Sequence, residues 1–156
     1  MASKNQILLY TDGAAKGNPG RGGYGVVLIF GKHRKELSEG FIKTTNNRME
    51  LLAVIAGLEA LTTSEYPVSI YSDSKYVVDA INKGWLRKWA KTGFKKKKNI
   101  DLWQRFLPLQ RKYNLNFNWI KGHAGYAENE RCDQLAVKAA EGGNLKADAG
   151  FIEAVN

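Results

Sequence analysis

The period of the apolar pattern changes at Asn47, and this change limits the possible folds more than any other feature. Before it, the runs 6–11, 24–30 and 34–42 are apolar or alternate between polar and apolar side chains, which predicts three strands. From Asn47 to Leu61, apolar residues recur at helical spacing and predict an amphipathic helix. Strands that follow one another directly pair as antiparallel hairpins. The chain therefore begins with three antiparallel strands and one helix.

Strands and helices alternate in the rest of the chain. Strands are predicted at 68–72 and 115–120, and helices at 74–81, 99–113 and 128–141. A strand, helix, strand order favours parallel pairing through a right-handed crossover. A length of 156 residues supports one core and is too short for two ordinary domains. We predict one α/β domain over 1–156, with a five-stranded mixed sheet of three antiparallel strands plus parallel strands, flanked by helices.

Two segments carry no regular period. Glycines and a proline punctuate residues 14–23, which predicts a turn. The tail at 142–156 has no strong pattern, and we expect it to be loosely held.

The charge balance indicates a polyanionic partner. The 24 Lys and Arg outnumber the 15 Asp and Glu, a difference of 24 − 15 = +9. Charge alone does not separate nucleic acid from an anionic membrane surface, or from basicity that only aids solubility. The single Cys132 rules out an intrachain disulfide and fits a reducing compartment. Because the sequence has neither a signal-like segment nor an apolar run near ~18 residues, we expect a cytoplasmic protein without a membrane partner.

Two aspartates each follow a strand-like run. Asp12 ends the run 6–11 and Asp73 ends the run 68–72. Ligand sites of α/β sheets lie at the carboxyl ends of strands, and parallel neighbours are ~4.8 Å apart. If these strands are neighbours, the carboxylates repel unless a cation or proton lies between them. The alternative for each aspartate is a turn or a helix cap.

Three further residues are open to two interpretations each. Glu50 could close a capping box with Asn47, or serve a site. Asp133 lies near the start of the last predicted helix, where a carboxylate also complements the helix dipole. His123 stands between small residues, either as an ordinary surface side chain or as one free to move, with a pKa suited to proton transfer.

Residues 83–98 form a basic segment. They include eight basic residues and no acidic one, interleaved with Trp85, Trp89 and Phe94. Cations suit backbone phosphates, and aromatic faces can pack on sugars or bases. A solvated lysine run at the end of a helix is the alternative.

Six motifs in order resemble those of the type 1 ribonuclease H family, specifically bacterial-type ribonuclease HI. They are Thr11-Asp12-Gly13, the glycine-rich stretch 17–25, the run 44–50, Ser72-Asp73-Ser74, 121–125 and 129–133. The resemblance covers residues 6 to about 141. Each motif is weak alone, but the six together are specific.

The resemblance implies a site in which four carboxylates hold two Mg²⁺ ions. Asp12 would bridge both ions, Asp133 would hold the ion that activates water, and Glu50 with Asp73 would hold the other. An all-oxygen ligand set suits hard cations, and Mn²⁺ could substitute. His123 would act as a mobile proton carrier and aid product release.

The resemblance also assigns the substrate contacts. Asn18, Asn46 and Asn47 would contact the backbone and minor groove of an RNA–DNA hybrid, and Thr45 would anchor a DNA phosphate. The ribose 2′-hydroxyl would distinguish the RNA strand. Lys75 would be placed at the minor-groove base edges, but it departs from the family pattern, in which many relatives carry Gln at this position.

The basic segment 83–98 resembles the family's basic protrusion, which grips the DNA strand. Trp85, Trp89, Lys88 and Lys91 would make these contacts. The protrusion is shorter here than in some relatives, which predicts a weaker grip.

By resemblance, the chain is expected to be a monomeric, Mg²⁺-dependent endoribonuclease. It would hydrolyse the RNA strand of hybrids to 5′-phosphate and 3′-hydroxyl ends, removing RNA primers and R-loops. One rival is a non-catalytic basic module that binds hybrids or duplex RNA. A second is a DNA-cutting nuclease or strand-transfer enzyme on the same fold.

Overall fold

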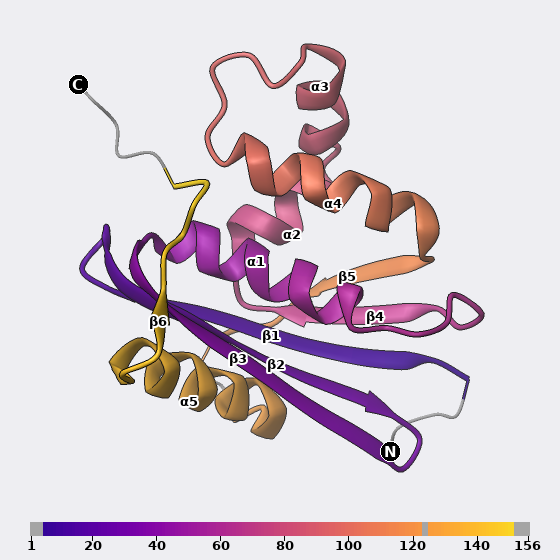
Figure 1. Cartoon of the computed structure of the whole chain (residues 1–156). Coiled ribbons are helices and arrows are strands. Elements are labelled where there is room, and N and C mark those ends of the chain that lie inside the picture. Colours follow the sequence, from indigo (N-terminus) through magenta and orange to yellow (C-terminus); the bar gives the residue numbers. More distant parts are fainter. Residues whose placement is uncertain (1–4, 123–124, 152–156) are drawn as a thin grey trace.

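A mixed β-sheet separates two helical layers in the computed structural model, which describes residues 5–122 and 125–151 (Figure 1). The strand order is β5-β4-β1-β2-β3-β6. The strands are β1 (Ile7–Lys16), β2 (Gly20–Phe30), β3 (His33–Thr44), β4 (Val68–Ser72), β5 (Leu115–Trp119) and β6 (Leu145–Lys146). The helices are α1 (Asn46–Glu59), α2 (Lys75–Asn82), α3 (Trp85–Lys91), α4 (Ile100–Lys112) and α5 (Ala127–Glu141).

The pairing of the strands confirms the predicted mixed sheet. Strands β1, β2 and β3 are antiparallel neighbours, whereas β4 is parallel to β1 and β5 is parallel to β4. Over residues 5–122 and 125–151 the sheet has six strands instead of the predicted five, because the short strand β6 adds to the edge of β3 in parallel.

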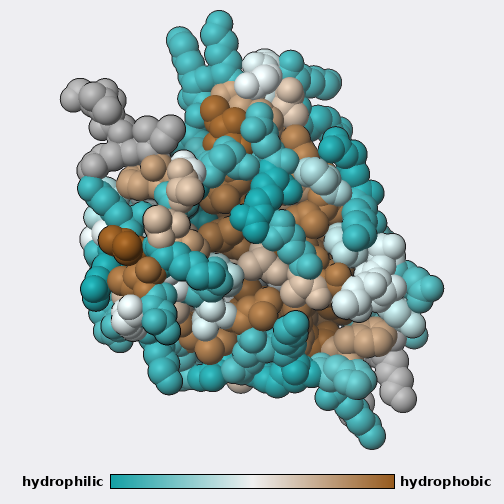
Figure 2. Space-filling view, viewed as in Figure 1, coloured by the Kyte–Doolittle hydropathy of each residue, from teal (hydrophilic) through white to brown (hydrophobic). Residues whose placement is uncertain are grey.

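Helices cover both faces of the sheet. Helix α5 packs on β1, β2 and β3 from one side, while α1 packs on β1 and β2 from the other, with α4 against α1 (Figure 1). The core between α1, α4 and the sheet includes the fully buried Leu9, Ile55, Ile70, Trp103 and Phe106. Hydrophilic side chains cover most of the outer face of α3 and α4, and apolar side chains are visible beneath them (Figure 2).

The predicted turn at 14–23 is wrong except at its centre. Strand β1 continues to Lys16 and β2 begins at Gly20, so most of the glycines lie inside strands. A β-carbon at Gly23 would lie 2.5 Å from the carbonyl oxygen of Ala136 in α5. Glycine is therefore required here for close packing of helix and sheet rather than for a turn.

Thr45, and not Asn47, caps helix α1. The Thr45 side chain accepts a hydrogen bond from the Arg48 backbone N–H at 3.3 Å, while Asn47 lies within the first turn of the helix. The capping-box interpretation of Glu50 therefore does not hold.

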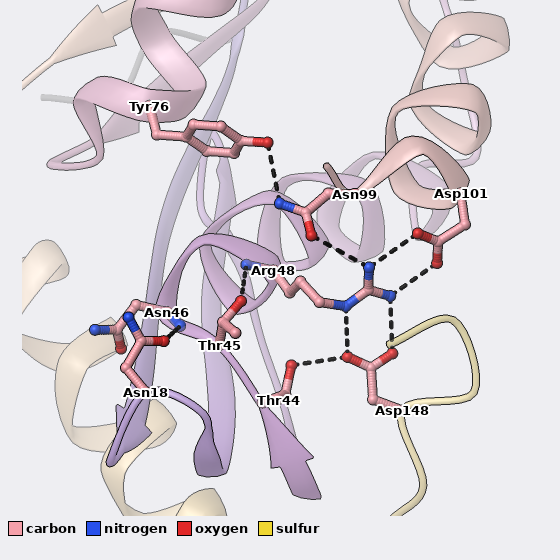
Figure 3. Close-up of polar contacts among 9 residues, drawn as sticks. All are labelled: Asn18, Thr44, Thr45, Asn46, Arg48, Tyr76, Asn99, Asp101 and Asp148. Carbon is pink, nitrogen blue, oxygen red and sulfur yellow. Dashed lines mark hydrogen bonds and ion pairs between the residues drawn. The ribbon is translucent and has the colours of Figure 1, made fainter. Parts of the chain in front are cut away.

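Residues 142–151 of the tail are better held than expected. Strand β6 pairs with β3 through Gly40 and Leu145, and Asp148 forms an ion pair with the buried Arg48 (Figure 3). The guanidinium of Arg48 donates to both Asp148 oxygens at 2.7 and 2.9 Å and also pairs with Asp101. Because Arg48 is only 2% exposed, it requires anionic partners, and the tail supplies one of them.

Among the helices of the described residues, none combines the length and apolar character needed to cross a membrane.

Candidate active site

The register of β1 and β4 brings Asp12 and Asp73 together. Tyr10 lies opposite Tyr71 in this parallel pair, so Asp12 and Asp73 each follow two residues later at the same edge. Asp12 is 5% exposed, and its Oδ1 accepts a hydrogen bond from the Gly13 N–H at 2.9 Å.

Two glycines let the helices approach these aspartates. A β-carbon at Gly13 would lie 2.5 Å from the backbone nitrogen of Glu50, so α1 can approach the backbone next to Asp12 only because residue 13 has no side chain. Gly25 pairs with Asp12 across β1 and β2, and a β-carbon there would lie 2.2 Å from the Cys132 carbonyl oxygen in α5. Close packing on both faces thus places Glu50 and Asp133 beside Asp12.

All four predicted carboxylates line one cavity of about 330 Å³, together with Asn46, Asn47 and Lys75. Ligand oxygens of Asp12, Glu50 and Asp73 lie within 4.8 Å of one another. Asp133 lines the same cavity but lies outside that closest group.

The donor chemistry of this cluster fits a hard divalent cation. Every candidate ligand is a carboxylate oxygen, the type that Mg²⁺ and Mn²⁺ prefer. Within the described part of the chain, the buried Glu50 Oε1 has no hydrogen-bond partner. A buried acceptor without a donor is costly unless a proton or cation satisfies it. The residues therefore fit a metal site.

Burial and mutual repulsion raise the pKa of two carboxyl groups. Burial, followed by the charge of Asp73, raises the pKa of Asp12 to about 8, although the Gly13 N–H opposes the shift. Burial, followed by the charge of Asp12, raises the pKa of Glu50 well above its usual value. A bound cation would offset this repulsion and favour the ionised forms.

Comparison with known proteins decides the family. The sequence profile of the RNase H family matches residues 4–141. A ribonuclease H from Desulforamulus reducens is 58% identical over 148 residues, covering 92% of each chain. The chain belongs to the RNase H family. A ribonuclease HI from Synechocystis sp. is 47% identical and covers 96% of this chain and 97% of its own length.

Solved structures of RNase H proteins share the fold. LC9-RNase H1, a type 1 RNase H, has a TM-score of 0.80 at 29% identity, with 99% of this chain and 80% of that chain covered. LC11-RNase H1 in complex with an RNA/DNA hybrid has a TM-score of 0.64 at 29% identity, with 87% of this chain and 97% of that chain covered.

Of the predicted hybrid-binding residues of this RNase H chain, Asn46, Asn47 and Lys75 line the acidic cavity. Asn18, in the turn between β1 and β2, accepts a hydrogen bond from the Asn46 N–H at 3.2 Å (Figure 3). Asn18, Thr45 and Asn47 also line a second cavity of about 680 Å³, to which Lys97 and Lys98 contribute. Two basic side chains thus line the same cavity as Thr45, the residue proposed to anchor a DNA phosphate.

The basic segment 83–98 holds its predicted contact residues in α3. Lys88 and Lys91 are exposed near the end of this helix, and Trp85 is 38% exposed. Trp89 is partly buried against Trp103, with ring centroids 5.8 Å apart. Trp89 therefore has a packing role, whichever contact it makes with a substrate.

His123 lies outside the described residues, so its predicted role stays a prediction. Sequence reasoning overlooked two neighbours of Asp73, namely Trp119 at the end of β5 and Gly122. The alternation of 115–120 gave no signal for this contact, because it places Trp119 on the same face as the apolar Leu115 and Phe117.

Proposed function

We propose that the chain is a magnesium-dependent endoribonuclease that hydrolyses the RNA strand of RNA–DNA hybrids. The convergence of Asp12, Glu50 and Asp73 within 4.8 Å carries the proposal, because this arrangement lies in a chain of the RNase H family. A relative whose structure contains an RNA/DNA hybrid supports the substrate class.

The four carboxylates would hold two ions, with Asp12 shared, Asp133 on one side and Glu50 with Asp73 on the other. Bound there, the metals would lower the pKa of the attacking water and stabilise the leaving 3′ oxygen. Mn²⁺ would serve in the same ligand set. His123, three residues beyond Ile120, would carry a proton and assist product release.

Side chains around the cavity would distinguish the two strands. Asn46 and Asn47 carry amides, which both donate and accept hydrogen bonds and so match the ribose 2′-hydroxyl. Thr45, Lys97 and Lys98 would hold phosphates of the DNA strand at the second cavity. Trp85, Lys88 and Lys91 of α3 would extend this grip. The contact of Lys75 would be with the minor groove.

Attack by water, rather than by the 2′-hydroxyl, would leave 5′-phosphate and 3′-hydroxyl ends. Such an activity would suit a monomeric cytoplasmic enzyme that removes RNA primers and R-loops. A non-catalytic binding module would not need the costly cluster of buried acidic groups.

A substrate panel tests the proposal. The chain is incubated with end-labelled hybrid, duplex RNA, duplex DNA and single strands, each with and without Mg²⁺. We expect cleavage of the RNA strand of the hybrid alone, and only with the metal. Cleavage of duplex DNA would support the strand-transfer or DNA-nuclease rival, and binding without cleavage would support the non-catalytic module.

A further inference from the structure

Trp119 contacts the backbone of a proposed metal ligand. Its indole Nε1–H donates a hydrogen bond to the carbonyl oxygen of Asp73 at 3.1 Å. The side chain is 46% exposed, which is unusual for a tryptophan, so burial of its ring does not explain its position. The ammonium of Lys75 lies 5.0 Å from the centre of the same ring.

Gly122 contacts the carboxylate of the same aspartate. A β-carbon at residue 122 would lie 2.6 Å from Asp73 Oδ2, while its next neighbours, at 3.5 and 3.6 Å, belong to Asp73 as well. The backbone of Gly122 does not adopt the left-handed conformation that would itself demand glycine. The space in front of the Asp73 oxygen is therefore the reason for a glycine at this position.

The end of β5 is fixed relative to Asp73 through the sheet. Ser72 lies opposite Trp119 in the β4–β5 pair, and the Ile120 N–H donates to the Ser72 carbonyl oxygen at 2.9 Å. Within residues 119–122, the first two thus hold the main chain around Asp73 by hydrogen bonds, and Gly122 limits the positions that the Asp73 carboxylate can take.

We propose that Trp119 and Gly122 are positioning residues that set the orientation of the Asp73 carboxylate for metal binding. This inference rests on the proposed function, because it takes Asp73 as a Mg²⁺ ligand. The hydrogen bond from Trp119 would fix the position of the Asp73 backbone. Gly122 would leave the carboxylate in the one orientation that points into the cavity shared with Asp12 and Glu50. Neighbours that orient metal ligands typically change metal affinity by about 10- to 100-fold when altered.

The test compares three variants of the full chain. Gly122→Ala adds only the β-carbon that meets Asp73. Trp119→Phe removes the N–H donor and keeps an aromatic face for Lys75. Gly143→Ala is the matched control, because a β-carbon there meets no atom within 4 Å and the backbone is not left-handed. Each protein is titrated with Mg²⁺ alone, without substrate, and binding is followed by the NMR chemical shift of the Gly13 amide, which lies beside Asp12. Thermal unfolding of each protein is recorded in parallel.

We expect Gly122→Ala to weaken Mg²⁺ binding by about tenfold or more. Its unfolding midpoint should stay close to that of the wild type, because the atom displaced is the far end of a side chain. Trp119→Phe should weaken binding by about three- to tenfold, the equivalent of one hydrogen bond. Gly143→Ala should bind as the wild type does. In Gly122→Ala and Trp119→Phe the hybrid KM should change less than the Mg²⁺ dependence of cleavage, and in Gly143→Ala neither should change.

Wild-type Mg²⁺ affinity in both Gly122→Ala and Trp119→Phe would overturn the inference. If Gly122→Ala fails to fold, Trp119→Phe decides the question alone. If the wild type binds Mg²⁺ but leaves hybrids intact, the proposed function fails while the affinities still test the positioning role. A wild type whose Gly13 amide does not respond to Mg²⁺ would overturn the inference, whatever the cleavage assay shows.

Discussion

Asp12 is the residue on which the electrostatics of the site converge. It lies between Glu50, Asp73 and Asp133, is almost fully buried, and accepts one backbone hydrogen bond. An ionised Asp12 without a cation is therefore unfavourable in the folded chain. This predicts a measurable dependence of stability on pH in the absence of metal.

The variant Asp12→Asn should stabilise the metal-free chain at alkaline pH. The folded pKa of Asp12, about 8, lies above its ordinary value of 3.8, so the folded chain binds this proton more tightly than the unfolded chain. Stability from this group is complete at low pH and is lost as the pH rises through about 8. The amide introduced by the substitution stays neutral, so the variant should exceed the wild type by at least about 1 kcal/mol at pH 9, and by less at pH 5.

Urea unfolding in the presence of a chelator, at both pH values, measures this difference. Groups that do not interact with Asp12 are common to the two proteins and cancel, whereas loss of the Asp12 charge also lowers the pKa of Glu50 and adds to the difference in the same direction. A difference between them that does not grow with pH would contradict the raised pKa.

His123→Ala should remain active at a reduced rate. A general acid or base contributes about 10²- to 10⁴-fold, whereas losing a shared metal ligand removes several effects together. Single-turnover and steady-state rates across Mg²⁺ concentrations would show a lower turnover number with little change in hybrid affinity. Wild-type rates would make His123 a surface residue, and a loss as complete as that of Asp12→Asn would make it a primary member of the site.

At the scale of elements, glycines decide how the helices meet the sheet. Strand β2 carries Gly23 and Gly25 under α5, where β-carbons would collide with the helix backbone. Because these close approaches join residues more than 100 positions apart, the local pattern around Gly23 predicts a turn instead. Substitutions there should disturb the placement of α5 and with it Asp133.

The tail is joined to α1 and α4 by the Arg48 ion pairs, and Asp148→Ala should destabilise the fold by about 3 kcal/mol. The change leaves a buried guanidinium with one carboxylate in place of two, and removes the acceptor of the Thr44 hydroxyl (Figure 3). Lys146→Ala is the control, since it breaks the exposed pair with Glu39 and should change stability by at most about 1 kcal/mol. Equal effects in chemical denaturation would contradict a structural role for Asp148.

The double variant Lys97→Ala/Lys98→Ala should reduce the salt dependence of hybrid binding. Both lysines line the cavity that includes Thr45. Each lysine–phosphate ion pair that is lost should make the slope of log affinity against log salt shallower by about 0.9, so the double variant should make it shallower by about 1.8. The control is Lys32→Ala/Lys35→Ala, which removes the same charge from the β2–β3 hairpin. This hairpin lies near the start of β1, whereas Lys16 is at the other end of that strand. Equal slopes in the two double variants would assign Lys97 and Lys98 to solubility.

At the scale of the molecule, the sequence predicted what depends on local pattern. The strands before Asp12 and Asp73 and the helix starting near Asn47 follow from periodicity, and the antiparallel and parallel pairings of the strands follow from chain connectivity. The convergence of Glu50 and Asp133 on Asp12 does not follow from spacing, because it depends on the close approach of helices at Gly13 and Gly25. Only resemblance to a family supplied it.

Two other features had no local signal. The pairing of Arg48 with Asp148 spans 100 positions, and the tail around Asp148 has neither strand nor helix periodicity. Likewise, the hydrogen bond of Trp119 to the carbonyl of Asp73 depends on the register of β4 and β5. Such interactions are set by tertiary packing, which a single sequence does not reveal.

The most direct test of the central claim is a single-turnover assay with a hybrid labelled differently on its RNA and DNA strands, using the wild type and Asp73→Asn. Asparagine removes a ligand charge at nearly constant volume, so hybrid binding should be retained. We expect the wild type with Mg²⁺ to cut the RNA strand alone, leaving 5′-phosphate ends, and Asp73→Asn to give no measurable product. Cleavage of the DNA strand, 2′,3′-cyclic phosphate ends, or near-normal turnover by Asp73→Asn would contradict the account.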